Sequence, residues 1–168
     1  MIIGANGAGK STILKIILGF IYPTSGVINT SHLVFGYVPE KVNMPSFVSV
    51  YSFLDTIREL KKGKTKELDY YLDYFSLTTA KEKRLGELSK GMLQKVIIIQ
   101  AFLGEPDVLV FDEALNGLDS VMQKKLLELI KKEKKKNKII LITSHYKDYY
   151  HDVVTKTIEI RDGLLWEN

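Results

Sequence analysis

Glycines and a lysine with a fixed spacing lie near the start of the chain. The segment Gly4-Ala-Asn-Gly-Ala-Gly-Lys10-Ser11-Thr12 follows the pattern G-x-x-x-x-G-K-[ST]. Glycines let consecutive backbone N–H groups turn towards an anion, and Lys10 adds a flexible positive charge. Ser11 supplies a hydroxyl oxygen of the kind that Mg²⁺ prefers. The spacing therefore predicts a phosphate-binding loop for a nucleoside triphosphate with its Mg²⁺.

The residues on either side of this loop fit a strand followed by a helix. Met1-Ile2-Ile3 is apolar, and apolar residues recur from Ile13 to Leu18. A helix here would direct its positive N-terminal dipole at the same anion. A glycine-rich turn in another fold is the alternative, and the flanking pattern argues against it. We expect phosphate contacts from Asn6, Gly7, Ala8, Gly9, Lys10, Ser11 and Thr12.

Two adjacent acids follow a wholly apolar run. Residues 108–111 are typical of a strand that is buried on both faces, and Asp112 and Glu113 come directly after it. Ligands of open α/β sheets bind at the carboxyl ends of the strands, so these acids should face the phosphate loop. We expect Asp112 to hold Mg²⁺ and Glu113 to polarise an attacking water. For an isolated Asp-Glu pair, a helix N-cap is the competing interpretation.

Strand and helix signals alternate along the chain, which predicts an α/β fold with a mostly parallel sheet. Ser49, Thr65, Ser89 and either Asp119 or Ser120 are the expected helix caps. Residues 27–28 suggest a short extended piece. Strands are expected over 33–38, 108–111 and 138–143, with a terminal hairpin of 157–160 and 164–166. Helices are expected over 50–60, from the cap Thr65 through 75, over 91–103 and over 120–136.

Residues 46–86 carry a helical pattern inside the α/β pattern. We therefore expect one domain over 1–168, in which a small helical subdomain (46–86) is inserted between two parts of an α/β core (1–45 and 87–168). A length of 168 residues suits one domain with a sizeable core. The absence of cysteine excludes disulfides and thiolate metal sites and favours a reducing compartment.

The charge pattern is basic. The net charge is +4, and six lysines lie between Lys131 and Lys138. This cluster could be a patch for nucleic acid or anionic lipid. A solvated helix C-terminus is the favoured interpretation, because no aromatic residues interleave the cluster as a stacking platform would need. No apolar run approaches the ~20 residues that span a bilayer.

Six motifs, in order, resemble those of the ATPase subunit of ATP-binding cassette (ABC) transporters. That family has a phosphate loop, a Gln loop, an L-S-G-G-Q signature, a strand ending in Asp-Glu, a D-loop and a switch histidine. The counterparts here are Gly4–Thr12, Tyr37–Glu40, Leu88–Met92, Val108–Glu113, Asn116–Asp119 and Thr143–His145. The resemblance covers essentially the whole chain, and it implies a P-loop NTPase fold with a RecA-like core.

The resemblance also implies roles and partners. ATP and Mg²⁺ would be the ligands, with Ser11, Glu40 and Asp112 at the metal and with Glu113 and His145 as catalytic residues. Ser89, Lys90 and Gly91 would act on ATP held by a second ATPase subunit, identical or not, and Asp119 would couple the two sites. An integral membrane permease would be the other partner, on the cytoplasmic face of the membrane. No nucleic acid is expected.

The chain departs from the family pattern at several positions. Glu40 stands in place of Gln, and Lys90 and Met92 replace a Gly and the final Gln of the signature. These variants resemble exporter-type bacterial cassettes. The leading antiparallel β-subdomain, with its adenine-stacking aromatic residue, is missing before the loop. This predicts an N-terminally truncated cassette with weaker ATP affinity and an exposed apolar sheet edge.

Two other functions fit the same motifs. One is a soluble cassette ATPase that works on ribosomes, DNA or cofactor assembly, and the lysine cluster is the feature in its favour. The other is a nucleotide-binding fragment that does not hydrolyse ATP.

Overall fold

The computed structural model describes residues 1–145, 147–161 and 163–167. At its centre is a six-stranded sheet with the order β2-β3-β4-β1-β5-β6. Neighbouring strands are parallel except for β5 and β6, which are antiparallel, so the predicted mostly parallel sheet is confirmed. The strands are β1 (Ile2–Gly4), β2 (Phe35–Val38), β3 (Val108–Asp112), β4 (Ile139–Thr143), β5 (Ile158–Arg161) and β6 (Leu164–Glu167).

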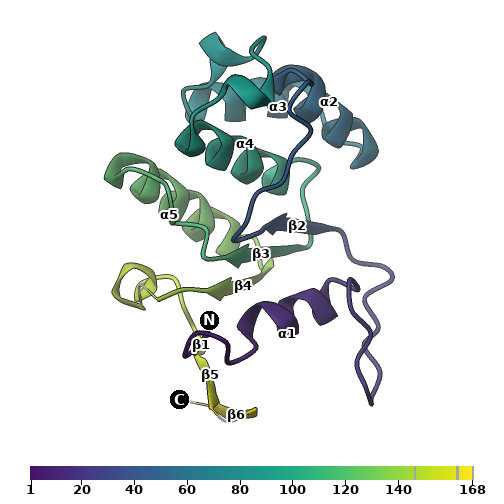
Figure 1. The fold of residues 1–168 in the computed structure, drawn as a ribbon, viewed down its shortest axis with the longest axis vertical. Helices are drawn as coiled ribbons and strands as arrows, with labels where there is room; N and C mark the ends of the chain where they lie inside the picture. Colours follow the sequence, from purple (N-terminus) through teal and green to yellow (C-terminus); the bar gives the residue numbers. More distant parts are fainter. Residues whose placement is uncertain (146, 162, 168) are drawn as a thin grey trace.

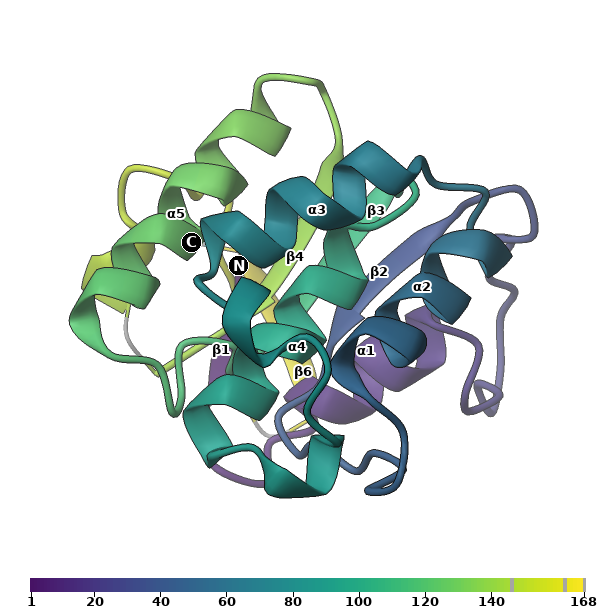
Figure 2. The ribbon, with the colours of Figure 1, turned by 90° about the horizontal axis from the view of Figure 1, so that it is seen from above.

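Helices cover both faces of the sheet (Figure 1). Helix α1 (Lys10–Ile17) lies on one face, and α4 (Lys90–Phe102) and α5 (Ser120–Lys134) lie on the other. Helices α2 (Val50–Leu60) and α3 (Thr65–Tyr74) pack beyond α4, away from the sheet. Seen from above in Figure 2, α3 runs beside α5. Three short 3₁₀ turns complete the described elements: η1 (Thr78–Ala80), η2 (Leu85–Glu87) and η3 (Lys147–Tyr150).

Strand β3 explains why the sheet carries helices on both sides. All five of its residues are buried. Val108 and Val110 pack in the cluster that includes Leu14 of α1, whereas Leu109 and Phe111 pack in the larger cluster on the opposite face. Each side chain removed from water in this way contributes about 1.5–3 kcal/mol. The strand is therefore held rigidly, and so are the acids at its carboxyl end.

Most of the predicted caps are present, and one is wrong. The side-chain oxygens of Ser49, Ser89 and Asp119 accept hydrogen bonds from the backbone N–H groups three residues later. Thr65 is not a cap, because α3 begins there and the extended residue Lys64 precedes it without a side-chain bond. The chain leaves α2 through a left-handed residue at 62, which shortens the connection and starts α3 early.

Element boundaries shift by small amounts, and one expected piece is absent. Helix α4 starts one residue before the predicted Gly91, because Ser89 caps it, and β3 continues to Asp112. Helix α5 ends at Lys134, earlier than the predicted 136. Residues 27–28 form no strand, and Val27 is 93 % exposed.

Apolar side chains are exposed at one edge of the sheet. Leu164, Leu165 and Trp166 of the edge strand β6 are each more than half exposed, which agrees with the predicted apolar edge. Phe20 and Tyr22, after α1, are also largely exposed. Among the described residues, no helix combines the length and the apolar character that crossing a membrane requires.

Candidate functional site

A hollow of about 330 Å³ lies at the carboxyl ends of β1, β2, β3 and β4. These four parallel strands are neighbours in the sheet, so the residues that follow them meet at one edge. The lining combines the loop after β1 with residues after the other three strands. It consists of Asn6, Gly7, Gly9, Lys10, Ser11, Thr12, Glu40, Asp112, Glu113 and His145.

The loop between β1 and α1 wraps around a buried ammonium group. Lys10 Nζ donates to the carbonyl oxygens of Gly4 and Ala5, at 2.9 and 3.0 Å, and the residue is only 8 % exposed. Gly7 and Gly9 have φ angles of 80° and 100°, which residues with a Cβ rarely adopt. The glycines of the predicted phosphate loop therefore stand where its backbone has positive φ angles.

Asp112 is fixed by a residue to which the sequence analysis gave no role. Thr143 Oγ1 donates to Asp112 Oδ1 at 2.5 Å, and Asp112 is 3 % exposed. The backbone N–H of Glu113 donates to the carbonyl oxygen of Thr143 at 3.1 Å. The parallel register of β3 and β4 pairs Asp112 with Thr143. Without this register the contact could not be predicted from the sequence. A polar residue ending an otherwise apolar strand was the only signal available.

Glu113 adopts an unusual backbone conformation. Its φ is 51°, a left-handed value that costs a residue other than glycine about 1–3 kcal/mol. The residue is buried, and Oε1 has no hydrogen-bond partner among the described residues. His145 Nε2 nevertheless lies 3.2 Å from that oxygen. The strained backbone and the nearby ring together hold the carboxylate towards the hollow.

The oxygens around the hollow suit a hard divalent cation. Ser11, Glu40 and Asp112 all line it. Burial is the main cause that raises the pKa of Tyr37 to about 12, and the negative charges of Asp112 and Glu40 add to it. Within the described residues, no group of three or more His, Cys, Asp or Glu could hold a metal alone. Mg²⁺ commonly uses one or two carboxylates together with phosphate oxygens and water, so the residues present fit it.

Comparison with known proteins agrees with this geometry. The family model described as "ABC transporter" matches residues 1–116. The chain belongs to the ABC transporter ATPase family. It is 36 % identical to the uncharacterized ABC transporter ATP-binding protein YthP of Bacillus subtilis, over 98 % of this chain and 72 % of that protein. The family resemblance stated from the six motifs is thereby confirmed.

Two further matches cover most of this chain. The zinc import ATP-binding protein ZnuC of Haemophilus influenzae is 37 % identical over 86 % of this chain, which spans 54 % of that relative's length. A solved ATP-binding subunit of an ABC transporter has a TM-score of 0.88 and 27 % identity, covering 99 % of this chain and 78 % of that one. The exporter-type expectation is not supported, because relatives named as importers match the chain. Substitutions at a few motif positions do not determine the direction of transport.

Several predicted site residues of the cassette lie away from the hollow. Ser89 and Asp119 cap α4 and α5, and they do not line the hollow; neither do Lys90 and Gly91. Ala8 packs instead in the apolar cluster under α1. The structure therefore brings together the loop, Glu40, the two acids and His145, and it leaves the signature segment on a separate surface.

The cassette also contains a link that sequence analysis missed. Gln94, in the second turn of α4, is buried, and its Nε2 donates to the carbonyl oxygen of Ala114 at 3.2 Å. This bond connects the signature helix to the residue after Glu113. A glutamine close before the apolar residues 96–99 was a signal for it.

Proposed function

We propose that this cassette binds Mg·ATP in the hollow at the strand ends and hydrolyses it to power a transporter. The observation that supports this most directly is the convergence of Lys10, Asp112 and Glu113 on one hollow from segments that are 102 residues apart in sequence. A cationic loop and a pair of acids facing each other are the arrangement that phosphoryl transfer requires.

In this proposal the residues of the hollow have distinct roles. Lys10 and the loop amides bind the β- and γ-phosphates. A bound Mg²⁺ would meet the oxygens of Ser11, Glu40 and Asp112 and would offset the phosphate charge. Glu113 orients and polarises the attacking water, because its buried carboxylate lines the hollow. His145 positions that carboxylate and reaches towards the γ-phosphate.

A second ATPase subunit would complete the site. The N-terminus of α4 carries Ser89, Lys90 and Gly91 on a surface apart from the hollow, and the first two are exposed. Amide donors at a helix N-terminus, together with a lysine, can neutralise γ-phosphate charge on a facing copy. Asp119, also exposed, would connect the two sites. We therefore propose that two cassettes, identical or not, close around ATP.

A membrane permease is the proposed second partner. A groove of about 360 Å³ lies beside the segment that leads to Glu40, between α1, β2, α2 and α4, and includes Phe20, Phe35 and Phe53. Its mainly apolar lining suits a short amphipathic segment of an integral membrane protein. Movement of Glu40 would then link the groove to the ATP site. This arrangement would place the cassette at the cytoplasmic face of the membrane.

The test is the variant Glu113→Gln. It should lower phosphate release by about two orders of magnitude or more, since general-base catalysis contributes about 10²–10⁴-fold. ATP binding should persist, and ATP should trap the variant as a dimer in size-exclusion chromatography. Glu82→Gln, at an exposed position far from the hollow, is the control. Undiminished phosphate release from Glu113→Gln would remove that residue as the base, and a wild-type chain that does not bind ATP would refute the proposal as a whole.

A further inference from the structure

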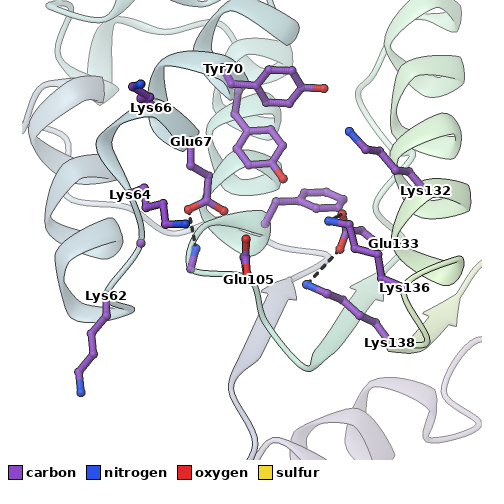
Figure 3. Close-up of a pocket in the computed structure, with 14 residues that line it drawn as sticks. Lys62, Lys64, Lys66, Glu67, Tyr70, Glu105, Lys132, Glu133, Lys136 and Lys138 are labelled. Carbon is purple, nitrogen blue, oxygen red and sulfur yellow. Dashed lines mark hydrogen bonds and ion pairs between the residues drawn. The ribbon is translucent and has the colours of Figure 1, made fainter.

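A second hollow, of about 420 Å³, lies at the edge of the sheet opposite to the one that carries the phosphate loop, and Figure 3 shows the residues that line it. It is formed by the start of α3, the turn between α4 and β3, and the last turn of α5. Gly104 and Glu105 precede β3, and Lys138 precedes β4, so this is the amino edge of the sheet. Its volume falls within the ~300–1,000 Å³ typical of small-molecule sites.

Aromatic side chains form one wall. Tyr71 and Phe102 are buried, with ring centroids 5.7 Å apart. Tyr70, beside them, is 46 % exposed, and Lys132 Nζ lies 5.7 Å from its ring centroid. The lysine cluster was interpreted from sequence as a solvated helix end because it lacked interleaved aromatic residues. The fold supplies them from α3, some 60 residues earlier in the sequence.

Lysines surround the opening in excess over the acids. Glu133 is buried and pairs with Lys136 at 2.8 Å and with Lys138 at 3.0 Å, so it is neutralised within the protein. Four further lysines line the hollow, and in the described part of the chain none of them pairs with a carboxylate. They are Lys62, Lys64, Lys66 and Lys132. An anionic group at the opening would meet uncompensated positive charge.

Two carboxylates turn towards the interior. Glu67 Oε2 accepts from the Gly104 N–H at 3.1 Å, which leaves Oε1 available. Glu105 is exposed and pairs with no side chain among the described residues. In Figure 3 the two carboxylates face into the hollow from different sides. They can accept hydrogen bonds from N–H donors of a ligand.

We propose that this hollow is a second nucleotide site, which binds a purine mononucleotide. The base would pack against Tyr70 and Tyr71, its N–H groups would donate to Glu67 and Glu105, and the phosphate would lie among the lysines at the opening. A simple anion would leave the aromatic wall unused. An acidic peptide would bring carboxylates against Glu67 and Glu105.

Such a ligand would add a bridge between two helices, α3 and α5, that already contact each other further along their length. Tyr74 and Lys125 join the end of α3 to α5, through hydrogen bonds of 3.1 and 2.7 Å to each other's backbone carbonyl oxygens. At the start of α3 the hollow separates the two helices. A nucleotide there would bridge α3 to the end of α5, far from the Mg·ATP hollow.

Equilibrium dialysis of AMP and GMP against the full chain tests the site. The variant Lys10→Ala, in EDTA, removes binding at the phosphate loop, so this test is separate from that of the proposed ATPase. We expect saturable binding of one nucleotide per chain. Lys132→Glu should weaken it at least about tenfold, the equivalent of 1.4 kcal/mol. Lys135→Glu, the same charge change at the residue that directly follows α5 and lies outside the hollow, should leave it within about twofold.

Several outcomes would overturn the site. These are an absence of saturable binding, equal effects of Lys132→Glu and Lys135→Glu, equal binding of ribose 5-phosphate, or binding only of single-stranded RNA. A second measurement does not depend on folding of the variants. Photolysis of wild-type chain with 8-azido-AMP should give adducts on Tyr70, Tyr71 or Lys132, and adducts confined to residues 4–12 would refute the proposal.

Discussion

His145 Nε2 lies 3.2 Å from Glu113 Oε1, and the backbone N–H of His145 donates to Glu113 Oε2 at 3.4 Å. One residue thus contacts both oxygens of the carboxylate to which we assign the role of base. The two residues follow β3 and β4, which are neighbouring parallel strands. The pairing of β3 with β4 therefore brings Glu113 and His145 together within a single chain.

His145→Ala should lower ATP turnover by about 10²-fold, because it removes the group that positions Glu113 and reaches the γ-phosphate. ATP affinity should change little, since the loop and Lys10 remain. Phosphate release and nucleotide binding, measured on the same preparation, separate the two effects. His151→Ala is the matched control, because the His151 side chain is 88 % exposed and pairs with Asp152 on the surface. Full turnover by His145→Ala would exclude the positioning role.

Thr143→Val should destabilise the protein by about 1–3 kcal/mol, because it leaves a buried Asp112 oxygen without its donor. Thr143→Ser keeps the hydroxyl and should lose less. Urea unfolding measures both variants. A Val variant as stable as the Ser variant would show that the hydrogen bond adds nothing to stability.

The local parts of the site could be predicted from the sequence, and the parts that depend on register could not. Gly4–Thr12 is contiguous, so its spacing alone indicates a phosphate loop. Asp112 and Glu113 were placed correctly because an apolar run marks a buried parallel strand, whose carboxyl end meets the loop. The bond from Thr143 to Asp112 depends on how β3 pairs with β4, which composition does not specify.

Other differences between the predicted and the observed structure come from contacts and turns that the local sequence does not specify. Tyr70 and Lys132 come together because α3 lies beside α5, so the aromatic neighbours of the lysine cluster could not be identified from its own neighbours in sequence. The left-handed φ of Glu113 is imposed by the surrounding structure, since Glu has no intrinsic preference for it. Lys64 displaces the predicted cap Thr65 because the turn after α2 is tight.

Tyr150→Phe should stabilise the protein by about 1 kcal/mol, since a buried hydroxyl without a partner costs free energy. Tyr150 is fully buried, and its hydroxyl has no partner among the described residues. Burial, and then the charge of Glu113, raise the pKa of Tyr150. A raised pKa in the folded state means that wild type loses stability as the pH rises above 10, so the advantage of Phe should grow there.

Tyr74→Phe is the opposing control for this substitution. The Tyr74 hydroxyl donates to the carbonyl oxygen of Lys125, so its removal should cost about 1 kcal/mol in urea unfolding. If Tyr150→Phe is destabilised as much as Tyr74→Phe, the hydroxyl of Tyr150 has a partner and the prediction is wrong.

Lys61→Met should be most stabilising at neutral pH and lose that advantage in alkali. Burial is the main cause that lowers the pKa of Lys61 from 10.5 to about 8, against the opposing charge of Glu67. Between pH 8 and 10.5 the unfolded chain binds more protons at this residue than the folded chain, so wild-type stability rises with pH across that interval. Methionine has no such proton, so its contribution to stability does not change with pH in this way. The substitution also removes the bond from Lys61 Nζ to the Gln100 carbonyl oxygen, which shifts the stability by the same amount at every pH. Urea unfolding at pH 7, 8, 9 and 10 measures the difference, with Lys62→Met at the exposed neighbouring position as the control. A difference between Lys61→Met and wild type that does not change with pH would show that the pKa of Lys61 is not lowered.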